Sequence, residues 1–81
     1  MNDIEKKIKQ VIEEINTNVN VQISLETNFF ESDILDSYGM LEFIFKLENK
    51  FNIQFFNEDL ITQKFENIEN TSQTVKKYLT K

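Results

Sequence analysis

Apolar residues recur three and four positions apart near the start of the chain, the spacing of one face of a helix. This face is formed by Ile4, Ile8, Val11, Ile12 and Ile15. Asn2 or Asp3 can cap such a helix, and the polar run that begins at Asn16 can end it. The pattern therefore predicts a first amphipathic helix.

Residues 17–36 show a different pattern. Apolar and polar residues alternate through Val19, Val21, Ile23 and Leu25. Alternation is typical of a half-buried strand, but the chain offers no second strand, and an isolated strand is not stable. We therefore expect a long loop whose apolar side chains hold it against the helices. Loops of this length are uncommon and are usually functional.

A second helix is expected to begin at Ser37 or one residue later. Its inward stripe would be Met40, Leu41, Ile44, Leu47 and Phe51, widened by Phe43 and Phe45. Asn52 can adopt the left-handed conformation that ends a helix. Glu48 falls inside the apolar arc, and we expect it at the rim, in reach of water or a lysine.

Two further helices follow. Residues 57–65 are predicted to form a short third helix capped by Asn57, and the last helix to start near Thr71 or Ser72. The inward residues would be Leu60, Ile61 and Phe65 in the third helix and Val75, Tyr78 and Leu79 in the last. The expected fold is an all-α, small four-helix bundle in one domain, residues 1–81, with three longer helices and one short one.

Composition supports a packed helical core. The chain has 81 residues with eight Phe, one Gly, no Pro, no Cys and no His. Disulfides are therefore excluded, and no metal site is expected because the commonest metal ligands are missing. No apolar run is long enough for a signal peptide or a membrane helix, so a cytoplasmic location is the default expectation.

Charge narrows the possible partners. The net charge is −5, and residues 26–69 hold ten carboxylates against three lysines. Such a field disfavours nucleic acid and anionic membranes and attracts basic protein surfaces. Ordinary solubilising charge is the simpler alternative.

Catalytic arrangements are missing from the sequence. A serine nucleophile needs a neighbouring base, and the chain has no histidine. No Gly-rich loop could hold a nucleotide, and no calcium-binding loop pattern is present. No catalytic residue is therefore expected.

The pair Asp36-Ser37 precedes the second helix, and the simplest interpretation is that one of them is an N-cap. The wider segment nevertheless resembles the phosphopantetheine-attachment region of acyl carrier proteins. The matching residues are Asp36-Ser37-Tyr38, Glu42, Leu47-Glu48 and Phe51-Asn52-Ile53, followed by Glu58-Asp59-Leu60, Phe65 and Ile68. Tyr38 stands where that family usually has Leu or Met, and Asn52 where it has Gly.

The resemblance implies that a phosphopantetheinyl transferase moves 4'-phosphopantetheine from coenzyme A onto the Ser37 hydroxyl, with Asp36 part of what the transferase recognises. A helix N-terminus stabilises a phosphodiester, so the physical chemistry agrees. The arm would carry an acyl or aminoacyl group as a thioester, loaded by a ligase and passed to an acyltransferase or synthase. The chain would be a monomeric carrier and not an enzyme.

Partners are expected to meet the exposed side of the second helix, at Tyr38, Glu42 and Phe45, with Asp33 nearby. Basic residues of the partner would face the carboxylates, an attraction that salt weakens. The alternative for Tyr38 and Phe45 is partial burial against the preceding loop.

Within the family, the chain looks closer to D-alanyl and other stand-alone carriers than to the carrier of fatty-acid synthesis. Two other readings stay open. One is a small acidic helical module that binds proteins and never carries an arm, and the other is a minimal hydrolase that uses Ser37.

Overall fold

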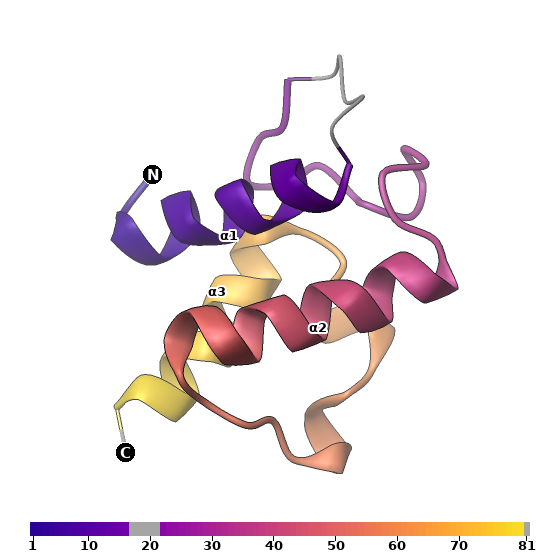
Figure 1. The fold of residues 1–81 in the computed structure, drawn as a ribbon. Helices are drawn as coiled ribbons and strands as arrows, with labels where there is room; N and C mark the ends of the chain where they lie inside the picture. The colour runs from indigo at the N-terminus through magenta and orange to yellow at the C-terminus, as the bar shows by residue number, and fades with distance from the viewer. Residues whose placement is uncertain (17–21, 81) are drawn as a thin grey trace.

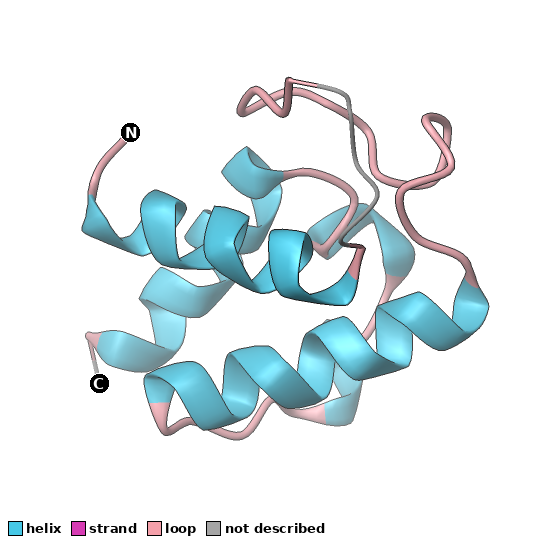
Figure 2. Ribbon diagram, turned by 45° about the horizontal axis from the view of Figure 1, so that its top comes forward, coloured by secondary structure: helices cyan, strands magenta, loops and turns pink. Residues whose placement is uncertain are grey.

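The computed structural model describes residues 1–16 and 22–80. Its elements are α1 (Asp3–Ile15), α2 (Ser37–Phe51), the single-turn 3₁₀ helices η1 (Asn57–Asp59) and η2 (Thr62–Lys64), and α3 (Ile68–Leu79). The described part of the chain contains helices and loops but no strand (Figure 2). α1 packs against both α2 and α3 (Figure 1). The all-α prediction is confirmed.

α1 follows the sequence pattern closely. The Asn2 side chain accepts a hydrogen bond from the Glu5 N–H at 2.8 Å, and the Glu5 carboxylate accepts one from the Asn2 N–H at 2.8 Å. This reciprocal capping box satisfies two amide groups that the first turn leaves unpaired. Ile8, Val11 and Ile12 are buried. The first helix and its cap are therefore as predicted.

The described part of the long loop, residues 22–36, is held by hydrogen bonds to the start of α3. The Phe29 N–H donates to the Glu66 carbonyl at 2.8 Å, and the Glu69 N–H donates to the Leu25 carbonyl at 3.1 Å. Ile23 is buried, as expected for a loop pinned by its apolar residues. Val19 and Val21 lie outside the described residues.

α2 buries most of the residues that the pattern predicted, with two exceptions. Phe43, Ile44 and Leu47 are buried, whereas Leu41 and Phe45 are exposed. The prediction that Leu41 faces inward was wrong. Residues two positions apart point about 200° apart on a helix, so Leu41 and Phe43 cannot both face the core. The larger Phe43 ring takes the interior position, edge-on to Phe29 with 5.6 Å between ring centroids.

The end of α2 is set by Asn52 and Glu48. Asn52 adopts φ 54° and ψ 51°, the left-handed conformation expected from the sequence. The Glu48 carboxylate accepts a hydrogen bond from the Phe55 N–H at 2.9 Å, and its carbonyl accepts one from the Ile53 N–H at 3.0 Å. Glu48 therefore holds the turn after α2, whereas the sequence suggested contact with water or a lysine.

Asn52→Ala is expected to lower the free energy of unfolding by about 1 kcal/mol, because a β-carbon disfavours the left-handed region and alanine lacks asparagine's compensating polar side chain. Asn52→Gly is expected to match or exceed the wild type. Urea unfolding measures both, with Asn49→Ala on the exposed face of α2 as the control. Equal midpoints for Asn52→Ala and Asn52→Gly would contradict this role.

The predicted third helix over residues 57–65 is absent, and two 3₁₀ turns, η1 and η2, take its place. Asn57 is not a cap, since Phe56 occupies the cap position and η1 has no side-chain cap bond. Phe65 is buried as predicted, but Leu60 and Ile61 are exposed. Asp59 is buried instead, and a continuous helix with Leu60 and Ile61 inward could not place that carboxylate in the interior.

α3 starts at Ile68, three residues before the earlier of the two predicted starts. Asn67 is the cap, and its side chain accepts a hydrogen bond from the Asn70 N–H at 2.7 Å. Val75 is buried as predicted, but Leu79 is exposed. Thr71 is fully buried, and its hydroxyl is satisfied there because it donates to the Asn67 carbonyl at 2.7 Å. The apolar pattern missed this turn because its inward residues include polar side chains that bond to the helix itself.

Candidate functional site

Ser37 is the first residue of α2 and is exposed to solvent. The Asp36 carboxylate accepts a hydrogen bond from the Gly39 N–H at 2.7 Å, and the Asp36 carbonyl accepts one from the Met40 N–H at 2.9 Å. Asp36 is therefore the N-cap. Capping does not use the Ser37 hydroxyl.

The loop before α2 presents this end of the helix. Ile34 and Leu35 are buried, and their N–H groups donate to the Phe29 carbonyl at 2.8 and 2.9 Å. Asp33 adopts a left-handed backbone with φ 58° and is exposed. The buried pair anchors the chain just before Asp36, so the residues that follow emerge at the edge of the bundle (Figure 1).

A surface hollow of about 470 Å³ lies between the end of α1, the loop and the first turns of α2. Its lining residues are Ile15, Asn16, Asp33, Ile34, Leu35, Asp36, Tyr38, Gly39 and Glu42. A β-carbon at Gly39 would lie 3.1 Å from Leu35 Cδ2 and 3.3 Å from the capping oxygen of Asp36. Gly39 thus lets Leu35 pack closely under the first turn of α2.

The site suits a phosphodiester chemically. α2 has 15 residues, and its N-terminus carries the positive end of the helix dipole. The first N–H groups of a helix have no acceptor within the helix and are available to phosphate oxygens. Ser37 therefore combines an exposed hydroxyl with an environment that favours a phosphate ester.

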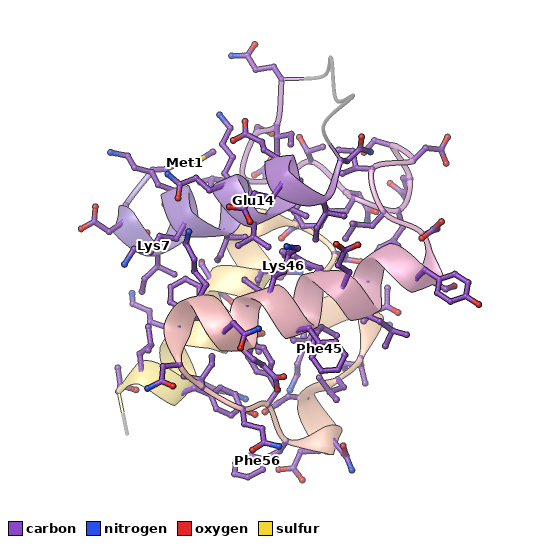
Figure 3. All side chains as sticks on the ribbon, viewed as in Figure 1. Met1, Lys7, Glu14, Phe45, Lys46 and Phe56 are labelled. Atoms are coloured by element: carbon purple, nitrogen blue, oxygen red, sulfur yellow. The ribbon has the colours of Figure 1, made fainter. Side chains whose placement is uncertain are left out.

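The outer face of α2 is formed by Tyr38, Leu41, Glu42 and Phe45, and is called the α2 outer face below. The exposed fractions of Tyr38, Phe45 and Leu41 are 84%, 66% and 59%. Figure 3 shows Phe45 on the side of α2 away from α1, and Lys46 on the side toward α1. The alternative that Tyr38 and Phe45 are partly buried against the loop is therefore excluded.

Leu41 belongs to this face although the sequence pattern placed it in the core. It follows Tyr38 by three positions and precedes Phe45 by four, so the three side chains form one stripe. That spacing was the available signal, but it is equally the spacing of an inward stripe. Only the rotation of α2 about its axis decides whether this stripe faces the core or the solvent.

A second polar cluster surrounds Asp59, which is 5% exposed. Its Oδ1 accepts hydrogen bonds from Lys64 Nζ and, at 3.0 Å, from Lys77 Nζ. Its Oδ2 accepts one from the Tyr78 hydroxyl, whose oxygen accepts one from the Phe56 N–H at 2.9 Å. The bond from Lys64, followed by those from Tyr78 and Lys77, holds the pKa of Asp59 well below its usual range. The sequence analysis did not single out this cluster.

Acid should weaken the fold through Asp59. In the unfolded chain the Asp59 carboxyl has an ordinary pKa of about 3.9, above its value in the folded protein. The stabilisation that its ionised form gives the fold is therefore complete above the unfolded pKa. It is lost as the pH falls from there toward the folded pKa. The free energy of unfolding should thus fall below about pH 4, and fall less in Asp59→Asn.

Urea unfolding between neutral pH and pH 2.5 checks this expectation. Glu58→Gln is the matched control, because Glu58 is the exposed neighbouring carboxylate. In Glu58→Gln the free energy of unfolding should fall with pH as it does in the wild type. Parallel curves for the wild type and Asp59→Asn would contradict the role of Asp59.

Two features of the described residues bear on alternative functions. No helix among them is long and apolar enough to cross a membrane. Within the same residues, no three carboxylates gather in a group that could hold a metal ion.

The family model for the phosphopantetheine attachment site matches residues 6–75, and the chain belongs to this family. It is therefore a carrier domain and not an enzyme. Its cofactor is 4'-phosphopantetheine, held covalently.

Individual relatives point the same way. Over 48 residues the chain is 44% identical to the D-alanyl carrier protein of Leuconostoc citreum and 42% to that of Leuconostoc mesenteroides. Each match covers 57% of this chain and 62% of the relative. The acyl carrier protein of Buchnera aphidicola is 38% identical over 60 residues, 73% of this chain and 75% of that protein. No solved structure matches the chain.

Proposed function

We propose that this chain is an acyl carrier in which the Ser37 hydroxyl is the attachment point of 4'-phosphopantetheine. The observation that carries the proposal is the exposed hydroxyl at the N-terminus of α2, left out of the cap by Asp36. The chain has three other serines. The hydroxyl of Ser24 bonds to Thr27 Oγ1 at 3.0 Å, that of Ser32 to the Asn28 carbonyl, and that of Ser72 to the Glu69 carbonyl at 2.9 Å.

The roles of the chain's own residues follow from this position. The Ser37 oxygen attacks the pantetheine-bearing phosphorus of coenzyme A, the pyrophosphate P–O bond breaks, and adenosine 3',5'-bisphosphate leaves. The Ser37 proton passes to a base of the phosphopantetheinyl transferase, since the chain has no histidine. Asp36 fixes the first turn and presents a carboxylate beside Ser37 for the transferase to recognise. When attached, the arm supplies a thiol that carries an acyl or aminoacyl group as a thioester. Tethering raises the effective concentration of that cargo at each partner's active site.

The α2 outer face is the proposed docking surface for the transferase, the loading ligase and the downstream acyltransferase or synthase. Tyr38, Leu41 and Phe45 offer apolar contact, and Glu42 with the nearby Asp33 offers negative charge. Apolar anchors carry most of the affinity in such interfaces, whereas exposed charges mainly set orientation and association rate. The partners are expected to present an apolar pocket with basic residues at its rim.

The relatives suggest two kinds of cargo, because D-alanyl carrier proteins and an acyl carrier protein both match. The D-alanyl relatives support an aminoacyl cargo, activated by an ATP-dependent ligase. We place this activity in the cytoplasm, where coenzyme A is available. An interaction module without an arm, the alternative reading, is disfavoured by the family match over residues 6–75.

The test is intact-protein mass spectrometry after incubation with coenzyme A, magnesium and a broad-specificity phosphopantetheinyl transferase. The proposal expects a gain of one phosphopantetheinyl group. A folded protein that gains no mass would reject it.

A further inference from the structure

The interior beside α2 is filled by aromatic rings. Phe29, Phe43 and Phe65 are fully buried and come from the loop, from α2 and from the segment before α3. Phe29 and Phe43 meet edge to face at 5.6 Å, and Phe55 and Phe65 meet in the same way at 5.2 Å. Inserting further atoms into a core packed in this way forces side chains and backbone to move.

Residues 53–65, called the covering segment below, run from the end of α2 to the start of α3 on the side opposite α1 (Figure 1). Phe55 and Phe65 are its buried apolar anchors, whereas Leu60 and Ile61 face solvent. Phe55 also packs against the Tyr78 ring, with 5.0 Å between centroids.

Asp59 ties the covering segment to α3. Its carboxylate accepts hydrogen bonds from Lys77 and Tyr78 of α3 and from Lys64 of η2. The Tyr78 hydroxyl oxygen also accepts a hydrogen bond from the Phe56 N–H. Moving the segment away from α3 would separate the Asp59 carboxylate from two of its three donors, Lys77 and Tyr78, and leave it only Lys64. The network therefore resists opening of the bundle along this side.

These features limit the cargo. Each methylene group of an acyl chain favours an apolar environment over water by a factor of about four, so a long chain on a carrier is drawn to any apolar interior it can enter. Here the core is filled by phenylalanine rings, and the hydrogen bonds of Asp59 hold the covering segment against α3. The hollow beside Ser37 lies at the surface, and its wall mixes apolar side chains such as Ile15 and Leu35 with carboxylates such as Asp36, so it gives an acyl chain only partial apolar contact.

We propose that this carrier keeps its cargo outside the helix bundle and therefore serves short or polar acyl groups, aminoacyl groups among them. Asp59 is the residue that keeps the bundle closed to longer chains. This inference rests on the proposed function and deepens it by naming the class of cargo.

The experiment compares a short and a long cargo on the same arm. The transferase loads acetyl- and octanoyl-phosphopantetheine from the two acyl-coenzyme A compounds onto the wild type, Asp59→Asn and Glu58→Gln, and mass spectrometry verifies each product. Hydroxylamine then cleaves the thioesters, and each rate is divided by that of the same acyl-pantetheine free in solution. The melting temperature of each loaded protein is recorded in parallel.

For the wild type we expect normalised rates that agree within about twofold and melting temperatures that do not depend on the acyl group, since neither chain is buried. Glu58→Gln should behave in the same way. In Asp59→Asn the octanoyl thioester should react at least about fivefold more slowly than the acetyl one. The octanoyl chain would spend most of its time in the bundle, and hydroxylamine reaches the thioester only in the molecules whose chain is outside.

The possible failures are distinguishable. Slow cleavage and a raised melting temperature for the octanoyl form of the wild type would overturn the inference. Unprotected octanoyl in a folded Asp59→Asn protein would overturn the role of Asp59. If Asp59→Asn is unfolded by circular dichroism, Lys77→Gln, which removes the more exposed of the two lysines, takes its place with the same expected result. A wild type that gains no acyl-pantetheinyl mass would instead reject the proposed function.

Discussion

Ser37→Ala is expected to abolish the gain of one phosphopantetheinyl group that we predict for the wild type with coenzyme A, magnesium and a phosphopantetheinyl transferase. This is the largest effect we expect from any substitution in the chain. The bond to phosphorus needs a side-chain oxygen at the helix N-terminus, and alanine has none. The loss should therefore be complete, whereas weakened recognition would only slow the reaction.

Ser32→Ala is the matched control for this result. Ser32 is also exposed and lies five positions before Ser37, but its hydroxyl donates to the Asn28 carbonyl. It should gain the group as the wild type does. Ser37→Ala should stay folded, because Asp36 and not Ser37 caps α2. Full labelling of a folded Ser37→Ala protein would show that the attachment point lies elsewhere.

Phe43→Ala is expected to lower the free energy of unfolding by about 3–5 kcal/mol. Phe43 is fully buried and edge-on to Phe29, so truncation leaves a cavity that the packed core fills only in part. A chain of 81 residues has a total stability on the order of 4–12 kcal/mol, so this variant would be marginally folded. Urea unfolding followed by circular dichroism measures the change.

Phe45→Ala is the matched partner, two positions along the same helix. Its ring is 66% exposed, and stability should change by no more than about 0.5 kcal/mol. Its effect should instead appear in loading, as a loss of about tenfold in kcat/KM for the partner ligase. Gln10→Ala, on the exposed side of α1, should change neither quantity.

The pair tests both the rotation of α2 and the docking role of its outer face. Similar losses of stability at positions 43 and 45 would contradict the burial described for α2. A stable Phe45→Ala protein that is loaded at the wild-type rate would remove Phe45 from the docking surface.

Local signals predicted a large part of this fold. α1 and its cap, the start of α2, and the left-handed Asn52 each depend on residues within about four positions of one another, where capping and helical spacing act directly. The candidate attachment site is of this kind. Asp36, Ser37 and the helix that follows are adjacent in the chain, so the cap alone places Ser37 at the start of the helix. Its position at the edge of the bundle also depends on the buried Ile34 and Leu35.

The remaining features depend on residues far apart in the chain. The spacing of apolar residues in α2 allowed Leu41 to face inward, and only the packing of Phe43 against Phe29 rotated it to the surface. Residues 57–65 have helical spacing, but they form two 3₁₀ turns, and the buried Asp59, which ends the first of them, bonds to Lys77 and Tyr78, 18 and 19 residues away.

The sequence by itself therefore determined the helices with strong caps and stripes and the position of the candidate serine, because neighbouring residues decide these. The tertiary structure alone decided which face of α2 is exposed and how Asp59 joins residues 53–65 to α3. Burial depends on competition among side chains for one core. It also depends on hydrogen-bonding groups from other segments, such as the lysines that allow Asp59 to be buried.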